Sequence, residues 1–210
     1  MMAAESRVLY VVACAAPPVQ NIHELVEQAQ HDGWAVCVIP TPTAATWLDV
    51  GALAALTAHP VRSEFRGPHA ADPLPPATAV AVVPATFNTI NKWAAGISDT
   101  FALGILNEAL GLRLPIVVAP YAKRSLTAHP AFTGNIQSLY DWGVVILPTE
   151  GIRPITEGAP FRWHEVLDAI DAAIVPTPPG NRLTTRLSNR AALRVPRPRR
   201  SSDSHRSTSR

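Results

Sequence analysis

One stretch near the middle of the chain constrains the fold more than any other. It begins with an apolar, largely β-branched run at residues 78–83, typical of a strand buried on both faces of a parallel sheet. Pro84 follows, and because proline has no backbone N–H, we expect the strand to end there. Apolar residues then recur at three- and four-residue spacing from Ile90 to Leu106, which predicts one long helix. The stretch therefore predicts a strand–turn–helix unit.

Three polar side chains lie in the turn between this strand and this helix, namely Thr86, Asn88 and Thr89. In open parallel sheets, ligands bind at the carboxyl ends of the strands, where each strand passes over to a helix. The first N–H groups of a helix have no partner within it, so they suit an anionic or carbonyl-rich ligand. The turn is therefore a candidate binding site.

The rest of the chain repeats the alternation of strand and helix. Strands are predicted at 8–13, 35–39, 114–119 and 144–147, and further helices at 21–30, 46–57, up to Trp142, and at 164–174. Strand, helix and strand in succession imply parallel pairing through right-handed crossovers. We therefore predict an α/β fold, a Rossmann-like three-layer sandwich around an open parallel sheet of about five strands.

Charge divides the chain of 210 residues into two parts. Residues 1–180 contain nine Lys and Arg against fifteen Asp and Glu, whereas 181–210 contain nine Arg against one Asp. We expect one folded domain at 1–178 and a disordered Arg/Ser/Pro-rich tail at 179–210. The tail is interpreted as solvated. Nucleic acid is not an expected partner, since no helix-turn-helix or zinc pattern accompanies the arginines.

The two cysteines, Cys14 and Cys37, lie on neighbouring predicted strands, which suggests two buried thiols in a reducing compartment. The apolar run after Arg7 is short for a secretion signal and continues smoothly as a strand, so we expect no signal. No stretch approaches the roughly 20 apolar residues of a membrane span. We expect a cytoplasmic protein with no membrane segment and no metal site.

The segment PATFNTINKWAAGISDT at residues 84–100 resembles the PASANT-type motif of the homo-oligomeric flavin-containing cysteine decarboxylases. That family includes phosphopantothenoylcysteine decarboxylase and the decarboxylases of lantibiotic peptides. Phe87 stands where the family usually has Ala. The matching positions are Pro84, Ala85, Thr86, Asn88, Thr89, Lys92, Gly96 and Asp99. The resemblance implies an FMN-binding flavoprotein that forms a homotrimer or a higher homo-oligomer.

The resemblance also implies a set of flavin contacts. The first turn of the family usually reads T-G-S-[IG]-A-A, and here it reads C-A-A-P-P-V, which assigns Ala15 and Ala16 to the flavin without the family's hydroxyl. Thr41 and Thr43 resemble the family's flavin-contacting T-P-x-A turn; a plain helix cap by Thr46 is the alternative. The remaining implied cofactor contacts are Thr86, Asn88, Thr89 and Ala119.

Catalytic and substrate residues are carried over from the same family. Its catalytic His lies about fourteen residues before the motif proline, which implies His69 as a base, although a solvent-exposed loop His is the alternative. Asn88 is implied to act on flavin or substrate. Lys123 and Arg124 stand near the position of the family's substrate-holding Asn, in P-x-M-N-x-x-M-W, so they could hold a carboxylate or phosphate instead. A solvated loop is the alternative reading of this pair.

The resemblance implies a flavin that oxidises a thiol to a thioaldehyde, after which the neighbouring carboxylate leaves as carbon dioxide. The coenzyme A enzyme carries a reactive Cys and G-x-G-R-M in a mobile flap, and residues 149–163 contain neither. We therefore expect an oxidoreductase or decarboxylase acting on another thiol-carboxylate, either a small molecule or a peptide. The alternative is a catalytically inactive, flavin-binding regulatory subunit.

Overall fold

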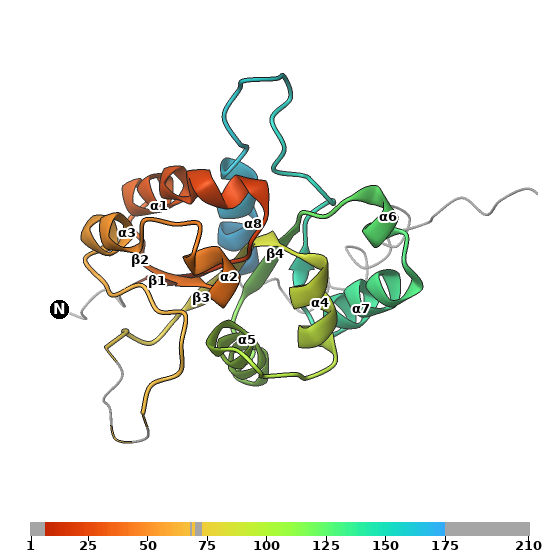
Figure 1. Cartoon of the computed structure of the whole chain (residues 1–210), viewed down its shortest axis with the longest axis horizontal. Helices are drawn as coiled ribbons and strands as arrows, with labels where there is room; N and C mark the ends of the chain where they lie inside the picture. The colour runs from red at the N-terminus through yellow and green to blue at the C-terminus, as the bar shows by residue number, and fades with distance from the viewer. Residues whose placement is uncertain (1–6, 68, 70–72, 175–210) are drawn as a thin grey trace, which may run out of the picture. The chain divides into compact units, whose positions relative to one another are not determined.

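The computed structural model describes residues 7–67, 69 and 73–174 of the chain, and the predicted tail at 179–210 lies outside these residues. Five parallel strands form one sheet in the order β2-β1-β3-β4-β5 (Figure 1). The strands are β1 (Val8–Ala13), β2 (Ala35–Pro40), β3 (Ala79–Ala85), β4 (Ile116–Pro120) and β5 (Val145–Ile146). The strand order reverses between β1 and β3, which is where open sheets of this kind bind ligands.

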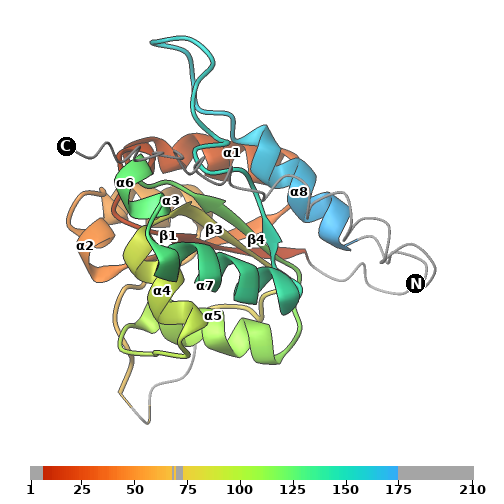
Figure 2. The ribbon, with the colours of Figure 1, turned by 90° about the vertical axis from the view of Figure 1, so that its right-hand side faces the viewer.

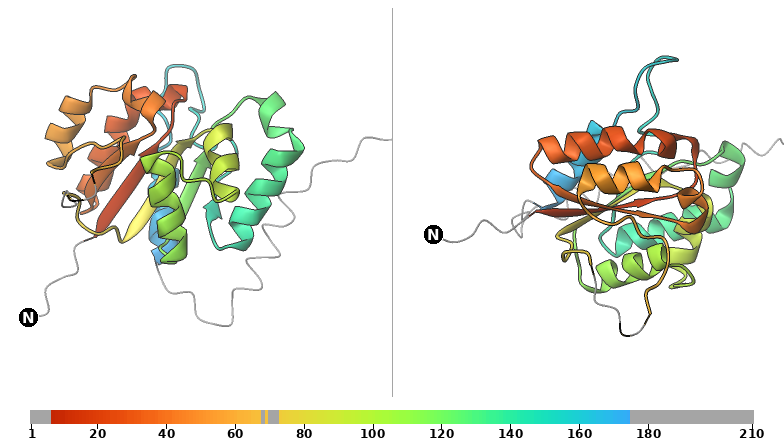
Figure 3. Two further views of the ribbon diagram at one scale, coloured as in Figure 1. Left: turned by 60° about the horizontal axis from the view of Figure 1, so that its bottom comes forward. Right: turned by 60° about the vertical axis from the view of Figure 1, so that its left-hand side comes forward.

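Helices cover both faces of the sheet, so the predicted three-layer α/β fold is confirmed (Figures 2 and 3). One face is packed by α1, α3 and α8, and the other by α4, α5 and α7. The helices are η1 (Pro17–Asn21, a 3₁₀ helix), α1 (Ile22–His31), α2 (Pro42–Ala45), α3 (Val50–Thr57), α4 (Phe87–Ala94), α5 (Phe101–Gly111), α6 (Arg124–Thr127), α7 (Pro130–Asp141) and α8 (His164–Ile174).

The central strands are apolar throughout because both of their faces are covered. In β1, Leu9 and Val11 pack in the cluster with α1 and α8, whereas Val8 and Val12 pack in the cluster with α4, α5 and α7. Every residue of β1 and β3 is buried. This double burial explains why the sequence shows continuous apolar runs rather than an alternation of apolar and polar residues.

The prediction that the third strand ends at Pro84 is wrong, because β3 continues to Ala85. Pro84 lies in an irregularity of the β3–β4 ladder, between the paired residues Val82 and Ala85, and follows a cis peptide bond. A bulge is one of the few places in a sheet where a residue without an N–H fits. The carbonyl of Pro84 still accepts a hydrogen bond from the N–H of Cys14, at 3.1 Å.

Two predicted helices differ from those of the structure: one is divided and the other begins later. The long helix expected from Ile90 to Leu106 is instead α4 and α5, because Gly96 adopts a φ of +71° and the N–H of Ile97 closes the end of α4 on the carbonyl of Lys92. The helix expected at 46–57 begins later, at α3, and the short α2 precedes it. Apolar periodicity alone revealed neither the break between α4 and α5 nor the later start of α3.

Candidate functional site

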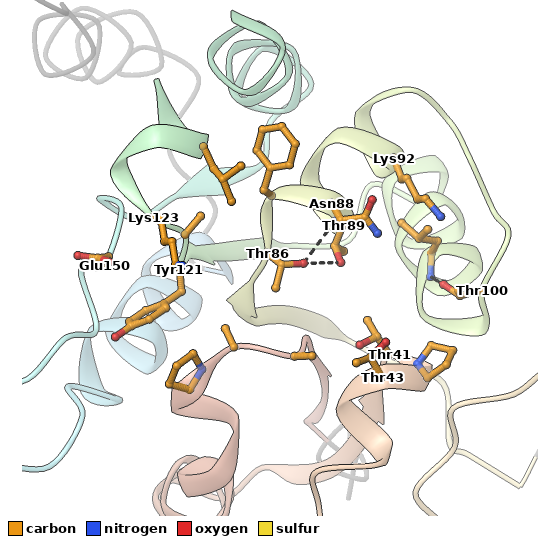
Figure 4. A pocket seen from close by; sticks show the side chains of 18 of the residues that line it. Thr41, Thr43, Thr86, Asn88, Thr89, Lys92, Thr100, Tyr121, Lys123 and Glu150 are labelled. Atoms are coloured by element: carbon orange, nitrogen blue, oxygen red, sulfur yellow. Dashed lines mark hydrogen bonds between the residues drawn. The ribbon is translucent and has the colours of Figure 1, made fainter. Parts of the chain in front are cut away.

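A cavity of about 1000 Å³ opens at the carboxyl ends of β1, β2, β3 and β4, where the strand order reverses (Figure 4). Eight of the residues predicted for the site line it: Ala15, Ala16, Thr41, Thr43, Thr86, Asn88, Thr89 and Lys123. The sequence places these residues on four separate segments, and the parallel order of the strands brings the segments together. This cavity is therefore the candidate functional site.

The turn between β3 and α4 forms the centre of the cavity wall. The hydroxyl oxygen of Thr86 accepts a hydrogen bond from the N–H of Thr89 at 3.4 Å and so caps α4. The two threonine hydroxyls also lie 3.1 Å apart (Figure 4). Thr89 is only 5% exposed, whereas the neighbouring Asn88 is exposed. Thr86, Asn88 and Thr89 all line the cavity, with Thr89 largely buried and Asn88 the most exposed of the three.

The Cys14 thiol lies directly behind this turn and donates a hydrogen bond to the Thr89 hydroxyl at 3.3 Å. Burial raises the pKa of the Cys14 thiol, and hydrogen bonds with Thr89 and Thr86 oppose that rise. Both Cys14 and Cys37 are buried thiols that form no disulfide, as predicted. A buried neutral thiol of this kind supports the threonine turn rather than acting as a nucleophile.

The β2 end of the cavity is built by short capped turns. Thr41 caps α2, since its hydroxyl accepts from the N–H of Ala44 at 3.3 Å, whereas the Thr46 hydroxyl donates to the carbonyl of Thr43. Thr41 and not Thr46 is therefore the cap. At the neighbouring β1 turn, η1 begins at Pro17, and the preceding Ala16 provides no side-chain cap.

The opposite end of the cavity consists of residues that follow β4 and β5. Tyr121, Glu150 and Arg153 line it together with Lys123. The Arg153 guanidinium donates to Glu150 at 2.7 Å and lies 5.4 Å from the centre of the Tyr121 ring. The Glu150 carboxylate raises the pKa of Arg153. In Figure 4, Tyr121 and Glu150 lie on one side of Thr86, and Lys92 and Thr100 lie on the other.

Sequence reasoning missed Tyr121, Glu150 and Arg153 as site residues. The only local signal was an acidic and a basic residue three positions apart in the segment after Pro148. The approach of Glu150 and Arg153 to the cavity depends on a hydrogen bond between distant segments, from the N–H of Glu150 to the carbonyl of Pro120 at 2.8 Å. Further lining residues that were not predicted are Pro17, Pro42, Phe87, Lys92, Thr100, Leu103, Ala122 and Leu126.

Three of the predicted site residues do not line this cavity. His69 is exposed in a turn of the segment between α3 and β3. Ala119 is 1% exposed and packs in the core of the sheet. Arg124 is exposed at the start of α6. Their predicted roles in catalysis, cofactor binding and substrate binding stay predictions.

The described residues also bear on a metal site and on a membrane-spanning helix. Within residues 7–67, 69 and 73–174, no cluster of three or more His, Cys, Asp or Glu side chains has the arrangement of a metal site. None of the helices in the described part of the chain is long and apolar enough to cross a bilayer.

The doubly wound sheet with a cavity at its switch point is the arrangement in which α/β proteins bind ligands. The chain belongs to the flavoprotein family, whose model matches residues 2–175. The sequence-based assignment to this family is therefore confirmed, and a flavin is the class of cofactor that this membership supports.

Curated relatives match parts of the chain. It is 28% identical over 146 residues to the coenzyme A biosynthesis bifunctional protein CoaBC of Mycolicibacterium smegmatis, across 67% of this chain and 34% of that protein. It is 39% identical over 62 residues to a cysteine/cysteine sulfinic acid decarboxylase of an unknown prokaryotic organism, across 30% and 16% respectively. The matched part of the chain therefore spans 34% of the length of the first relative and 16% of the second.

Solved structures share the fold over most of the chain. The FMN-dependent cysteine decarboxylase SpaF superposes with a TM-score of 0.62 at 21% identity, covering 81% of this chain and 98% of that one. The epidermin biosynthesis protein EpiD of Staphylococcus aureus gives a TM-score of 0.58 at 24% identity, covering 68% and 82%. At these identities the likeness establishes the fold.

Proposed function

We propose that this chain is an FMN-dependent flavoprotein that oxidises and decarboxylates a thiol bearing a carboxylate, on a small molecule or a peptide. The observation that carries the proposal is the cavity at the sheet's switch point, which gathers the hydroxyls of the family motif. Family membership and FMN-dependent cysteine decarboxylases among the structural neighbours support the choice of cofactor.

The lining of the cavity suits a flavin mononucleotide. A volume of about 1000 Å³ is at the upper end of the roughly 300–1,000 Å³ typical of small-molecule sites. Apolar side chains from several segments offer a surface for a tricyclic ring, namely those of Ala15, Ala16, Pro17, Phe87 and Leu103. The hydroxyls of Thr41, Thr43 and Thr86 and the first N–H groups of α4 offer partners for polar and anionic groups.

When bound, the flavin would supply a two-electron oxidant for the thiol. The substrate carbon that carries sulfur would lose two electrons and two protons with its thiol, giving a thioaldehyde. The electron pair of the bond to the carboxylate would then pass into the substrate, carbon dioxide would leave, and an enethiolate would remain, which takes up a proton from water to give the enethiol. In the proposal, Thr86 and Thr89 hold the cofactor and the exposed Asn88 orients the reacting groups. The role of His69 as base stays a prediction.

The standard coenzyme A pathway reaction is not part of the proposal, although CoaBC is a relative. The segment after β4 has no Asn at the position of the family's carboxylate clamp, and residues 149–163 have no Cys. A different thiol-carboxylate is therefore proposed as substrate. A homotrimer or higher homo-oligomer also stays a prediction, and light scattering of the purified protein would measure it.

The same missing groups favour a second candidate, a flavin-binding regulatory subunit without catalysis. The chain would then keep the threonine turn and the cavity but bind no substrate for turnover. The two candidates differ in what the bound flavin does, since only a decarboxylase transfers electrons from a thiol to it.

The test is reconstitution of the full chain with FMN followed by anaerobic addition of thiol-carboxylates, including phosphopantothenoylcysteine and peptides with a carboxyl-terminal cysteine. We expect a yellow protein whose flavin absorption bleaches as carbon dioxide is released. Bound flavin without bleaching across the panel would favour the regulatory subunit. A colourless chain that rejects added FMN would overturn both candidates.

A further inference from the structure

The turn that carries Glu150 and Arg153 is fixed to the sheet. The N–H of Glu150 donates to the carbonyl of Pro120 at 2.8 Å, and the N–H of Arg153 donates to the carbonyl of Glu150 at 2.8 Å. A Cβ atom at Gly151 would meet the carbonyl oxygen of Pro148 at 2.8 Å, so the turn closes tightly only with glycine there. The backbone that carries the Arg153 side chain is therefore fixed next to the carboxyl end of β4.

The returning limb of the same loop is held by Arg162. Its N–H donates to the carbonyl of Ile152 at 2.9 Å, and its guanidinium donates to the carbonyls of Gly151 and Arg153. Ile152 and Trp163 are fully buried on the two limbs. The loop between 153 and 162 projects from the body of the domain in Figures 1 and 2. Arg153 thus lies at the anchored base of the loop, not at its projecting end.

Arg153 lines the cavity, and part of its guanidinium has no hydrogen-bond acceptor among the described residues. One terminal nitrogen donates to Glu150, while the other terminal nitrogen and the Nε group have no partner among the described residues. The side chain is 55% exposed, and its guanidinium lies 5.4 Å from the centre of the Tyr121 ring. A guanidinium held in one place keeps N–H groups that can donate charge-assisted hydrogen bonds to a carboxylate.

The other cations near this end are less well placed. Lys123 lines the cavity, but no side-chain hydrogen bond or ion pair holds its ammonium group among the described residues, and Arg124 does not line the cavity. The hydroxyls of Thr41 and Thr86 and the N-terminus of α4 already provide partners for a phosphate elsewhere in the cavity. This leaves Arg153 available for an anion that belongs to the substrate.

We propose that Arg153 binds the carboxylate of the thiol substrate in this chain, with Glu150 and Arg162 as positioning residues. The inference rests on the proposed function. In this proposal, a residue of the loop after β5 makes the contact with the substrate carboxylate. The family resemblance assigns that contact to an Asn after β4. The predicted substrate is then a thiol whose carboxylate is free and ionised, such as a peptide that ends in cysteine.

The experiment uses the full chain loaded with FMN and two matched thiols, N-acetylcysteine and N-acetylcysteamine, which differ by the carboxylate. Anaerobic rapid mixing over a range of thiol concentrations gives an apparent Kd for each thiol, from the concentration dependence of the initial change in flavin absorption. The wild type is expected to prefer N-acetylcysteine. Arg153→Gln is expected to weaken N-acetylcysteine binding by roughly 10- to 100-fold, from the loss of charged hydrogen bonds, and to leave the Kd for FMN unchanged. Arg153→Lys should recover part of the preference.

Arg7→Gln is the matched control. Arg7 also pairs with a carboxylate, that of Asp171, and lies 4.1 Å from the centre of an aromatic ring, that of Trp34, but it does not line the cavity. Its replacement is expected to leave both thiol affinities unchanged. Arg162→Gln should reduce the preference for N-acetylcysteine, whereas a purely structural role would lower the melting temperature without changing that preference.

Three results would overturn the inference. One is equal affinity of the wild type for the two thiols, and another is an Arg153→Gln protein that keeps the wild-type preference. A third is a weakened Kd for FMN in Arg153→Gln, which would make the phosphate of the cofactor the partner of Arg153. A wild-type chain that rejects FMN would instead overturn the proposed function, and the inference with it.

Discussion

The two ends of the cavity are built in different ways. The threonine turn at Thr86 and Thr89 follows a fully buried strand, and a short local network with the Cys14 thiol holds it. The loop wall at Glu150 and Arg153 follows a strand of only two residues and consists of charged, partly exposed side chains. Contacts to distant segments hold this second wall in place.

The difference lies in the number of distant contacts on which each wall depends. The threonine turn is closed by the hydrogen bonds between Thr86 and Thr89, which are close in sequence, and has one further hydrogen bond from the distant Cys14 thiol. The loop wall depends on backbone partners such as Pro120 and on the buried Trp163, whose Nε1 group donates to Glu24 at 2.7 Å. We therefore expect cofactor binding to depend on the first wall and substrate choice to depend on the second.

The largest expected effect comes from removing the anchor of the loop wall. Trp163→Ala should lower the free energy of unfolding by about 3–5 kcal/mol, because it leaves a cavity in the core and deletes the hydrogen bond to Glu24. Equilibrium unfolding in urea measures the change. Trp142→Ala is the control, since Trp142 is 51% exposed and should cost much less. Equal losses in the two variants would contradict the anchoring role of Trp163.

Smaller effects on two properties, stability and FMN binding, are expected at the threonine turn. Thr86→Ala removes the cap of α4 and should cost about 1 kcal/mol of stability. It should also weaken FMN binding by roughly two- to tenfold through one lost hydrogen bond. Asp49→Ala removes the equivalent cap of α3, which accepts from Ala52 at 2.9 Å, and should change stability but not the Kd for FMN. Identical FMN affinities in both variants would sink the cofactor role of Thr86.

The buried thiol behind the turn predicts a dependence of stability on pH. The folded-state pKa of Cys14 is raised above its ordinary value of 9.0, mainly by burial, so the folded chain disfavours the thiolate. Its contribution to stability is therefore fully present below about pH 9 and is lost as the pH rises through the raised pKa. Urea unfolding from pH 7 upwards should show a steeper alkaline loss in the wild type than in Cys14→Ala. Parallel curves would refute this.

The smallest effect is expected in the projecting part of the loop. Ile155 is 84% exposed, so Ile155→Ser should change the free energy of unfolding by no more than about 0.5 kcal/mol. Comparison with Trp163→Ala distinguishes the contribution of the base of the loop to stability from that of its projecting part. A loss well above that limit in urea unfolding would mean that Ile155 packs against another surface in solution.

The amino-acid sequence by itself determined the layers of the fold and one side of the site. Continuous apolar runs predict strands covered on both faces, and they predict all five strands with errors at their ends. The motif from Pro84 to Thr100 likewise predicts the threonine turn and the family. These features could be predicted because they depend on residues within a few positions of one another. The break at Gly96 and the later start of α3 could not, since apolar spacing continues through both positions.

Only the tertiary structure decided which side chains form the cavity wall opposite the threonine turn. Tyr121 and Arg153 reach the cavity because β4 lies beside β3 and the turn at Glu150 hydrogen-bonds to the end of β4. Periodicity in a sequence reports which side of an element is buried, but it carries no information on which distant strand lies next to it. His69 illustrates the limit, because spacing along the chain suggested a catalytic residue and the fold leaves it exposed outside the cavity lining.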